Sequence, residues 1–457
     1  MNLTLRRIIF YTFCFLFLVI STLIILYASG YQINYRYLFT PLGVQKTGMT
    51  IIYSNPAGAD IYLNNKMVKR FSSPWLGQII PAQDIAIRTP ANIKDLAPGA
   101  YDLRVEISGY WPWERQINIS PGKITHVLDI NLFRKTSPEL MAQVASQPIS
   151  LSPNDKKIYL SASGRFFDLK TQTLGNTLAA AISSTSNVSW SADSNRLAVD
   201  KYLLNLKNPE KNLALDKIIG AGITNLKWNA ELDKIYYQYK NSIDVFSFSN
   251  QTSQTIVTAD NILDYEVANK NLYYVVRDGI NAKLEFYSLD GKKIVKEINL
   301  PASDGYQLIN PTAKLINLYD QKYQTLYLID PVVADANPIL ETIDSVKKTQ
   351  WISDSELVWA NDYEIWALDL DKNENKLITR WSQPITAIIK TKAANYILYT
   401  TAKTINVITW TASDDIQTTE LANFDSIASP VYNATEKNLY FTAKSGGEEG
   451  LYRLNIQ

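Results

Sequence analysis

Oxygen-bearing side chains alternate through the segment DLDKNENK, at Asp369, Asp371, Asn373 and Asn375. Alternating oxygen ligands are the pattern of a calcium-binding loop. Such a loop also needs a glycine at its sixth position and a glutamate at its twelfth, where this chain has Glu374 and Arg380. The segment therefore favours a polar hairpin between two strands, and we expect neither a metal ion nor any other cofactor.

Catalytic motifs do not stand out elsewhere in the sequence. His126 is the only histidine and Cys14 the only cysteine of the 457 residues. One cysteine allows no disulfide within the chain and no thiolate zinc site, and one histidine allows no HExxH motif. The sequence also contains no GxSxG motif and no phosphate-binding loop. We predict that His126 is a partly exposed residue on a strand and that the protein is not an enzyme.

The segment SGYWPWERQ carries the strongest candidate for ligand binding. Trp111 and Trp113 are predicted on one face of a strand that Arg115 continues, and exposed indoles could stack on a sugar or on a partner chain. The alternative is that the two rings pack inside the protein, against an insertion at 67–88 that holds Trp75, or against the C-terminal domain. We favour packing, because large aromatic side chains are mostly buried.

A repeat of about 40 residues fills the chain from about residue 148. Its anchor is an apolar or tryptophan residue, followed by a polar turn and a strand, and the anchors lie 38 to 42 residues apart. They are Leu151, Trp190, Trp228, Val267, Ile309, Trp351, Ile389 and Val431. A period near 40 with several strands per unit predicts a β-propeller, with eight blades, or seven if one unit is degenerate. We expect segment 139–145 to supply the outermost strand of the last blade, and the three repeat tryptophans to lie in blade cores.

Short strands separated by turns fill residues 47–133. SNPAGADIYLNN predicts a tight hairpin at Gly58 and a second turn at Asn64-Asn65. Alternating apolar residues predict further strands at 102–107, 116–119 and 125–132. These spacings predict a small β-sandwich or an open barrel.

Several motifs in this region resemble those of the PEGA domain. They are Pro56-Ala57-Gly58-Ala59, Thr89-Pro90, the run 96–101 (LAPGAY) and Ser108-Gly109-Tyr110, with alanine in place of the family's glutamate and an insertion at 67–88. LSPNDKKIYL likewise resembles the repeat of TolB-type propellers. The resemblance is to PEGA domain-containing bacterial membrane proteins, and it implies an extracytoplasmic module for binding or spacing.

An uncharged apolar run, 8–28, is long enough to cross a membrane, since 21 residues of helix span ~31 Å. Arg6 and Arg7 precede it, which predicts a cytoplasmic N-terminus and an extracytoplasmic body. A cleaved signal peptide is the alternative, but the run is longer than the apolar region of a signal peptide, usually about 7–15 residues, and favours a retained anchor.

The expected fold class is all-β after the N-terminal helix. The expected organisation is a cytoplasmic N-terminus (1–7), a transmembrane signal anchor (8–28), a juxtamembrane linker (29–46), the small β domain (47–133) and the propeller (134–457). With 45 Lys+Arg against 44 Asp+Glu, the chain offers no basic field for nucleic acid.

Two functions of different class remain open. The first is a membrane-anchored binding or scaffold protein of the bacterial cell envelope, whose partner is an envelope protein or a cell-wall glycan. The second is an extracytoplasmic propeller glycosidase or lyase, which needs carboxylates paired at the mouth of the channel. We predict the first.

Overall fold

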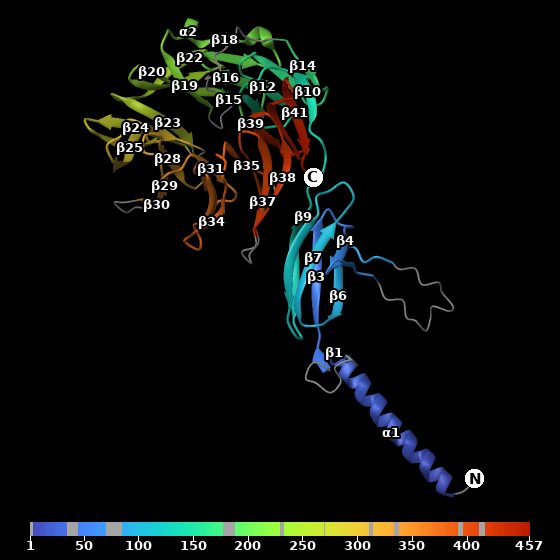
Figure 1. Cartoon of the computed structure of the whole chain (residues 1–457). Coiled ribbons are helices and arrows are strands. Elements are labelled where there is room, and N and C mark those ends of the chain that lie inside the picture. The colour runs from blue at the N-terminus through green and yellow to red at the C-terminus, as the bar shows by residue number, and fades with distance from the viewer. Residues whose placement is uncertain are drawn as a thin grey trace. The chain divides into compact units, whose positions relative to one another are not determined.

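The computed structural model describes residues 3–33, 44–69, 85–176, 188–228, 233–268, 270–309, 314–332, 338–391, 396–410 and 416–457. The chain divides into two compact units, Met1–Thr136 with Gln457, and Ser137–Ile456. Figure 1 traces both units along the chain. Most of the insertion, with Trp75, and residues 34–43 of the linker lie outside the described residues.

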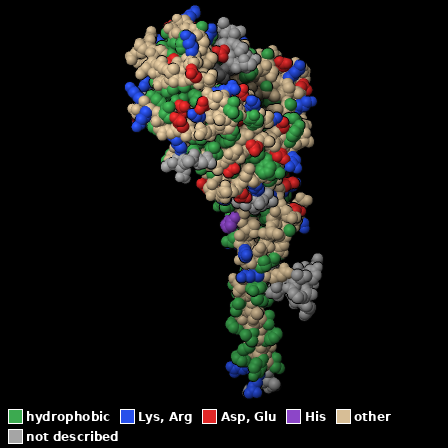
Figure 2. Space-filling view, turned by 90° about the vertical axis from the view of Figure 1, so that its left-hand side faces the viewer, with side chains coloured by type: hydrophobic (Ala, Val, Ile, Leu, Met, Phe, Trp, Pro, Cys, Tyr) green, Lys and Arg blue, Asp and Glu red, His purple; other side chains and the backbone are tan. Residues whose placement is uncertain are grey.

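The first element is the helix α1 (Leu3–Ala28), which contains the apolar run expected from the sequence. Arg6–Ala28 has a mean hydropathy of 2.7 and none of its most apolar window is buried within the protein. Figure 2 shows the resulting hydrophobic surface in green. This length and apolarity are those of a membrane span and equally of a signal sequence. A short sheet, β1 (Tyr31–Ile33) with β2 (Val44–Lys46), follows.

The small domain is a sandwich of two sheets. One sheet has the order β6-β3-β9 and the other β5-β4-β7-β8. Their strands are β3 (Gly48–Asn55), β4 (Asp60–Leu63), β5 (Lys66–Met67), β6 (Ala91–Leu96), β7 (Gly99–Glu106), β8 (Trp113–Ile119) and β9 (Ile124–Asn131). The expected strands at 102–107, 116–119 and 125–132 correspond to β7, β8 and β9.

The turn at Gly58 is not the hairpin that the sequence predicted. It carries the chain from β3 in one sheet to β4 in the other, so that Ile52 and Ile61 both enter the core from opposite sides, each 0% exposed. Gly58 has a φ of 90° and its amide donates to the Thr89 carbonyl oxygen at 2.7 Å. The prediction was wrong because alternating side chains suit a hairpin and a crossing between sheets equally well.

The turn at Asn64-Asn65 does close a two-residue hairpin, between β4 and β5. Both asparagines have positive φ, 49° and 62°. This is the geometry of a type I′ turn, whose twist matches that of the flanking strands. The second turn predicted in SNPAGADIYLNN is therefore confirmed.

The second unit contains eight four-stranded antiparallel sheets among its described residues, which confirms an eight-bladed propeller. We number the blades along the chain and give strands from innermost to outermost. Blades 1 to 3 are β11–β14 (Ile149–Leu151, Lys157–Leu160, Arg165–Asp168, Thr173–Leu174), β15–β18 (Val188–Trp190, Arg196–Val199, Tyr202–Asn205, Leu213–Ala214) and β19–β22 (Ile223–Trp228, Lys234–Tyr239, Ser242–Ser247, Thr252–Thr258). Short helical turns at Pro209–Lys211 and α2 (Leu215–Ile218) accompany blade 2.

Blades 4 to 8 follow the same order. They are β23–β26 (Ile262–Ala268, Asn271–Asp278, Asn281–Ser288, Lys293–Leu300), β27–β30 (Tyr306–Leu308, Ile316–Asp320, Thr325–Ile329, Ile339–Ile343), β31–β34 (Lys348–Trp351, Glu356–Ala360, Glu364–Asp369, Glu374–Arg380), β35–β38 (Ala387–Lys390, Tyr396–Thr400, Thr404–Trp410, Ile416–Asn423), and β39–β41 (Ser426–Asn433, Asn438–Ser445, Glu448–Asn455) with β10 (Glu139–Gln143). Figure 1 shows the blades in sequence from green to red.

Blade 8 is closed by chain from both ends of the unit, as the sequence predicted. Its outermost strand is β10, which pairs antiparallel with β41. Arg453 and Glu139 form an ion pair at 2.5 Å across this seam. The pairing removes two sheet edges that would otherwise be open to another chain.

The repeat tryptophans lie where successive blades meet. Trp351 is 8% exposed in a core cluster, and Trp190 and Trp228 pack against neighbouring clusters. The indole N–H of Trp190 donates to Ser150 Oγ, and that of Trp228 to the Ser189 carbonyl oxygen, both at 2.9 Å. Each bond joins the innermost strands of two consecutive blades, so these residues are core, as expected.

Candidate functional site

One end of the blades gathers two kinds of loop. Successive strands of a blade are antiparallel, so the turn between the second and third strands lies at the same end as the connection from the fourth strand to the next blade. Loops grouped at one end of a rigid scaffold are the usual location of binding residues. We call this end, which includes turns 321–324 and 361–363 and connections 344–347 and 381–386, the connection end.

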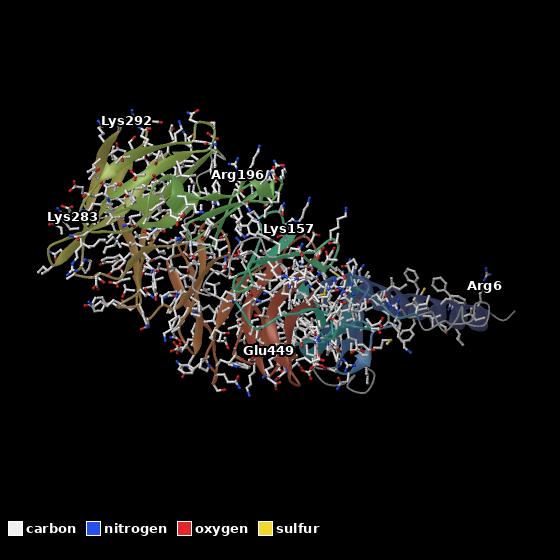
Figure 3. The ribbon with its side chains drawn as sticks, turned by 90° about the horizontal axis from the view of Figure 1, so that it is seen from above. Arg6, Lys157, Arg196, Lys283, Lys292 and Glu449 are labelled. Carbon is white, nitrogen blue, oxygen red and sulfur yellow. The ribbon has the colours of Figure 1, made fainter. Side chains whose placement is uncertain are left out.

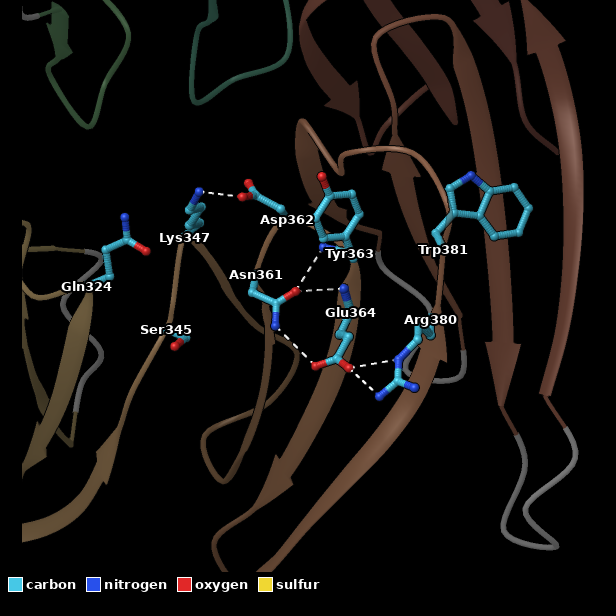
Figure 4. A pocket seen from close by; sticks show the side chains of 9 residues that line it. All are labelled: Gln324, Ser345, Lys347, Asn361, Asp362, Tyr363, Glu364, Arg380 and Trp381. Carbon is cyan, nitrogen blue, oxygen red and sulfur yellow. Dashed lines mark hydrogen bonds and ion pairs between the residues drawn. The ribbon is translucent and has the colours of Figure 1, made fainter.

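A cavity of about 570 Å³ opens at the connection end between blades 5 and 6, and we call it the blade-6 pocket. Its volume is in the range of small-ligand sites, roughly 300–1,000 Å³. Figure 4 shows the side chains that line it. They are Gln324, Ser345, Lys347, Asn361, Asp362, Tyr363, Glu364, Arg380 and Trp381.

The turn between β32 and β33 builds the centre of this pocket. Asn361 Oδ1 accepts hydrogen bonds from the amides of Tyr363 and Glu364, both at 2.8 Å. This side-chain turn holds three consecutive lining residues in fixed positions. The Trp381 amide donates to the Tyr363 carbonyl oxygen at 2.7 Å and ties the next connection to the same turn.

The four charged side chains of the pocket form two ion pairs. Glu364 Oε1 accepts from Arg380 Nε at 2.9 Å and Nη2 at 2.6 Å, and Lys347 Nζ lies 2.5 Å from Asp362 Oδ2. The bonds from Arg380, then from Trp366 and Asn361, hold the pKa of the Glu364 carboxyl below its usual range. The formal charges of the pocket are therefore balanced, with each carboxylate paired to one cation.

Two aromatic rings flank the ion pairs. Tyr363 is 48% exposed, a large fraction for a tyrosine. Trp381 is half-buried and meets the buried Tyr399 ring edge-on, with centroids 6.0 Å apart. Rings with one supported edge and one open face can stack on the apolar face of a ligand.

Paired carboxylates also occur on an innermost strand, where the enzyme hypothesis would need them. Asp264 Oδ1 and Glu266 Oε2, on β23, lie 3.1 and 3.4 Å from Lys227 Nζ on β19. Asp264 accepts further bonds from Asn225 and from its neighbour's amide. Burial raises the pKa of Glu266, whose Oε1 accepts the Val267 amide. Both groups are engaged in joining strands, and this arrangement does not favour catalysis.

The structure separates the residues singled out in SGYWPWERQ. Trp113 is 6% exposed and belongs to the core of the small domain, and Arg115 follows it on the same face, half-buried. Trp111 precedes the strand, is half-buried, and has the Lys135 ammonium 4.7 Å from its ring centroid. Trp113 is therefore packed, and Trp111 keeps only part of its ring accessible, so ligand stacking at Trp111 stays a prediction.

The other residues singled out in the sequence, His126 and the DLDKNENK segment, do not line the blade-6 pocket. His126 is exposed on β9, as a strand histidine. The DLDKNENK segment is the hairpin between β33 and β34. In it, Asp369 accepts the amides of Asp371 and Lys372 and pairs with the Lys372 ammonium, while Asn375 accepts the Trp359 indole.

Sequence reasoning missed the blade-6 pocket. Its residues span 324 to 381 and contain no motif. The one signal that could have found it was the place of the polar turn NDY (361–363) within the repeat, directly before the repeat strand EIWALD.

The class of protein that these parts define is an all-β chain with an apolar N-terminal helix, a sandwich and a propeller. Residues 83–134 match the PEGA domain family, so the match begins after the turn at Gly58. No curated protein matches the chain.

Solved propellers of low sequence identity are similar in fold. The C-terminal WD40 domain of Sif2 is 15% identical, with 69% of this chain and 98% of that one covered and a TM-score of 0.48. A eukaryotic initiation factor is 12% identical, with 75% and 94% covered and a TM-score of 0.49.

Proposed function

We propose that this protein is a non-catalytic, membrane-anchored binding or scaffold protein of the bacterial cell envelope. Helix α1 is its retained anchor, with the N-terminus cytoplasmic and the PEGA-like domain and TolB-like propeller outside. Arg6 and Arg7, ahead of the apolar run, support this orientation. The propeller is the binding head, and its ligand is a cell-wall glycan, with an envelope protein as the other partner class.

The observation that carries this proposal is the neutral, aromatic blade-6 pocket. Its two ion pairs cancel, so a charged ligand gains no net attraction there. The same groups keep free lone pairs and N–H groups at fixed positions, which suits the hydroxyls of an uncharged sugar. Tyr363, 48% exposed, offers a flat face for the C–H surface of a sugar ring.

The absence of catalysis is part of the proposal and is supported by the state of the carboxylates. A glycosidase needs one carboxylic acid with a raised pKa and one free carboxylate facing the substrate. In the blade-6 pocket the pKa of Glu364 is lowered by Arg380, and Asp362 is paired with Lys347. Glu364 is therefore poorly suited to donate a proton near neutral pH, and Asp362 is already engaged by Lys347.

The ligand is tested by titrating the full chain, in detergent micelles, with the tetramer of N-acetylglucosamine while following tryptophan fluorescence. We expect saturable binding that Tyr363→Ala weakens about tenfold, or ~1.4 kcal/mol. Tyr53→Ala is the matched control, since Tyr53 is 49% exposed but lies in the small domain. A missing signal, or equal binding by Tyr363→Ala, would contradict the glycan assignment.

The topology is tested with a single introduced thiol. Cys14 is the only native cysteine and lies in α1, so the unmodified chain gives the background. Lys293→Cys places a thiol on the exposed outer strand of blade 4, beside Lys292, which points outward in Figure 3. Labelling of intact cells by a membrane-impermeant maleimide is expected; labelling only after lysis would reverse the topology.

A further inference from the structure

A second cavity at the connection end lies on blade 3, and we call it the blade-3 pocket. Its volume is about 430 Å³. The turn at 240–241, the outer strand β22 and the connection from blade 2 form its walls. Its lining residues are Ile219, Tyr237, Tyr239, Lys240, Asn241, Ser242, Asp244, Ser253, Thr255 and Thr258.

Asp244 is the unusual member of this lining. It is 5% exposed, and its Oδ2 accepts a hydrogen bond from Ser242 Oγ at 3.1 Å. Its Oδ1 is also buried and, among the described residues, receives no hydrogen bond. Burying a carboxylate oxygen without a donor is costly, and native structures rarely leave such an oxygen unsatisfied.

Hydroxyl groups surround this carboxylate. Tyr237 and Thr255 are the residues opposite Asp244 in the register of the two neighbouring strands. The Tyr237 hydroxyl is hydrogen-bonded to Ser253 Oγ, and the single Ser242 hydroxyl proton is shared between Asp244 Oδ2 and the Tyr239 carbonyl oxygen, which lies 2.9 Å from Ser242 Oγ. Hydroxyl oxygens keep lone pairs when they donate, so the wall consists mainly of acceptors.

Lys240 does not neutralise Asp244 in this arrangement. Its ammonium lies 5.0 Å from the centroid of the Tyr239 ring, in a cation–π contact. The pocket therefore combines one negative charge, several neutral acceptors and an aromatic wall that already holds an ammonium group.

We propose that the blade-3 pocket binds a primary ammonium group. A single carboxylate matches one positive charge, and a primary ammonium has three N–H donors for Asp244 and the hydroxyls. Divalent cations prefer more carboxylate ligands than one, so the lining does not suit calcium. The ammonium can come from a lysine side chain or from an amino sugar.

The test is calorimetric titration of the full chain, in detergent micelles, with methylammonium chloride at constant ionic strength. Potassium and tetramethylammonium chloride are the controls for charge without N–H donors. We expect saturable binding of methylammonium only, and an affinity at least about tenfold lower for Asp244→Asn. Nα-acetyl-lysine amide and glucosamine, compared next, distinguish the two sources of the amine.

Two further variants keep the outcome interpretable. Asp233→Asn, in the same blade, changes a carboxylate that bonds to Ser247 and Ser249 and should bind as the unmodified protein does. Asp244→Asn should keep its melting temperature or raise it, because it removes a buried charge. Methylammonium binding to Asp244→Asn as tight as to the unmodified protein would overturn the proposal. The Lys240→Met variant removes the native ammonium group, and methylammonium binding seen only in that variant would overturn the proposal as well.

Discussion

The carboxylate of Asp264 accepts a hydrogen bond from the backbone amide of Leu308, at 2.7 Å, in the innermost strand of the next blade. Its other oxygen accepts from Asn225 Nδ2 at 2.5 Å and Lys227 Nζ at 3.1 Å in the preceding blade. One side chain, 7% exposed, therefore connects β19, β23 and β27. Buried charge is tolerable here because both of its oxygens are satisfied.

Asp264→Ala should destabilise the propeller by roughly 2–3 kcal/mol, because it leaves the Leu308 amide without its acceptor and leaves Glu266 as the carboxylate paired with Lys227. Chemical denaturation followed by tryptophan fluorescence measures this loss. Asp290→Ala is the control, since its pair with Lys270 is largely exposed, 73% and 80%, and should change stability by less than about 1 kcal/mol. Similar losses for both variants would contradict the bridging role.

Gly450→Val should weaken the closure of the ring. A Cβ at this position would lie 2.1 Å from Leu140 Cδ1 and 2.7 Å from the Ala142 carbonyl oxygen, both on β10. Overpacking of this kind costs about 1–3 kcal/mol or more, and here the backbone of β10 must move. Hydrogen exchange of residues 139–143 should rise. Gly175→Ala, whose nearest neighbour is 3.4 Å away, should leave that exchange unchanged.

The two tryptophans of the small domain should respond differently to truncation. Trp113→Ala removes a core side chain and should cost roughly 3–5 kcal/mol, measured as a lower melting temperature. Trp111→Ala removes a half-buried ring beside Lys135 and should cost clearly less. If Trp111→Ala proved as costly as Trp113→Ala, the ring would be structural and unavailable to a ligand.

The Glu364–Arg380 pair should make the blade-6 pocket sensitive to acid. Because the folded protein lowers the pKa of Glu364 below its ordinary 4.5, the stabilisation is present above that value and is lost as pH falls through the folded pKa. The melting temperature of the unmodified protein should exceed that of Glu364→Gln at pH 7. This difference should shrink below about pH 4. A difference that stayed constant from pH 7 to pH 3 would exclude the linkage.

The propeller could be predicted from the sequence because each blade repeats the same local sequence pattern. An apolar anchor lies at or near the end of each innermost strand, a polar turn follows, and the next strand is apolar, as at Trp190 and Trp351. Eight anchors therefore predicted eight blades. The strand at 139–143 could be predicted because the last unit lacked its fourth strand.

The small domain and the pocket show what a local pattern leaves undecided. The alternation around Gly58 predicts strands and a turn, but the packing of Ile52 and Ile61 decides that the turn joins two sheets. The blade-6 pocket depends on which blades are neighbours in space, since Gln324 and Trp381 are distant in sequence. Its residues carry no motif that would have marked them.

The most direct test of the proposed function is co-sedimentation of the full chain, in detergent micelles, with purified cell-wall sacculi. Unmodified protein and a Tyr363→Ala/Trp381→Ala variant are compared, with Tyr53→Ala as the control for exposed tyrosine. The account predicts that the unmodified protein and the control pellet with sacculi and that the double variant stays largely in solution. Absence of pelleting, or equal pelleting by the double variant, would contradict glycan binding at the blade-6 pocket.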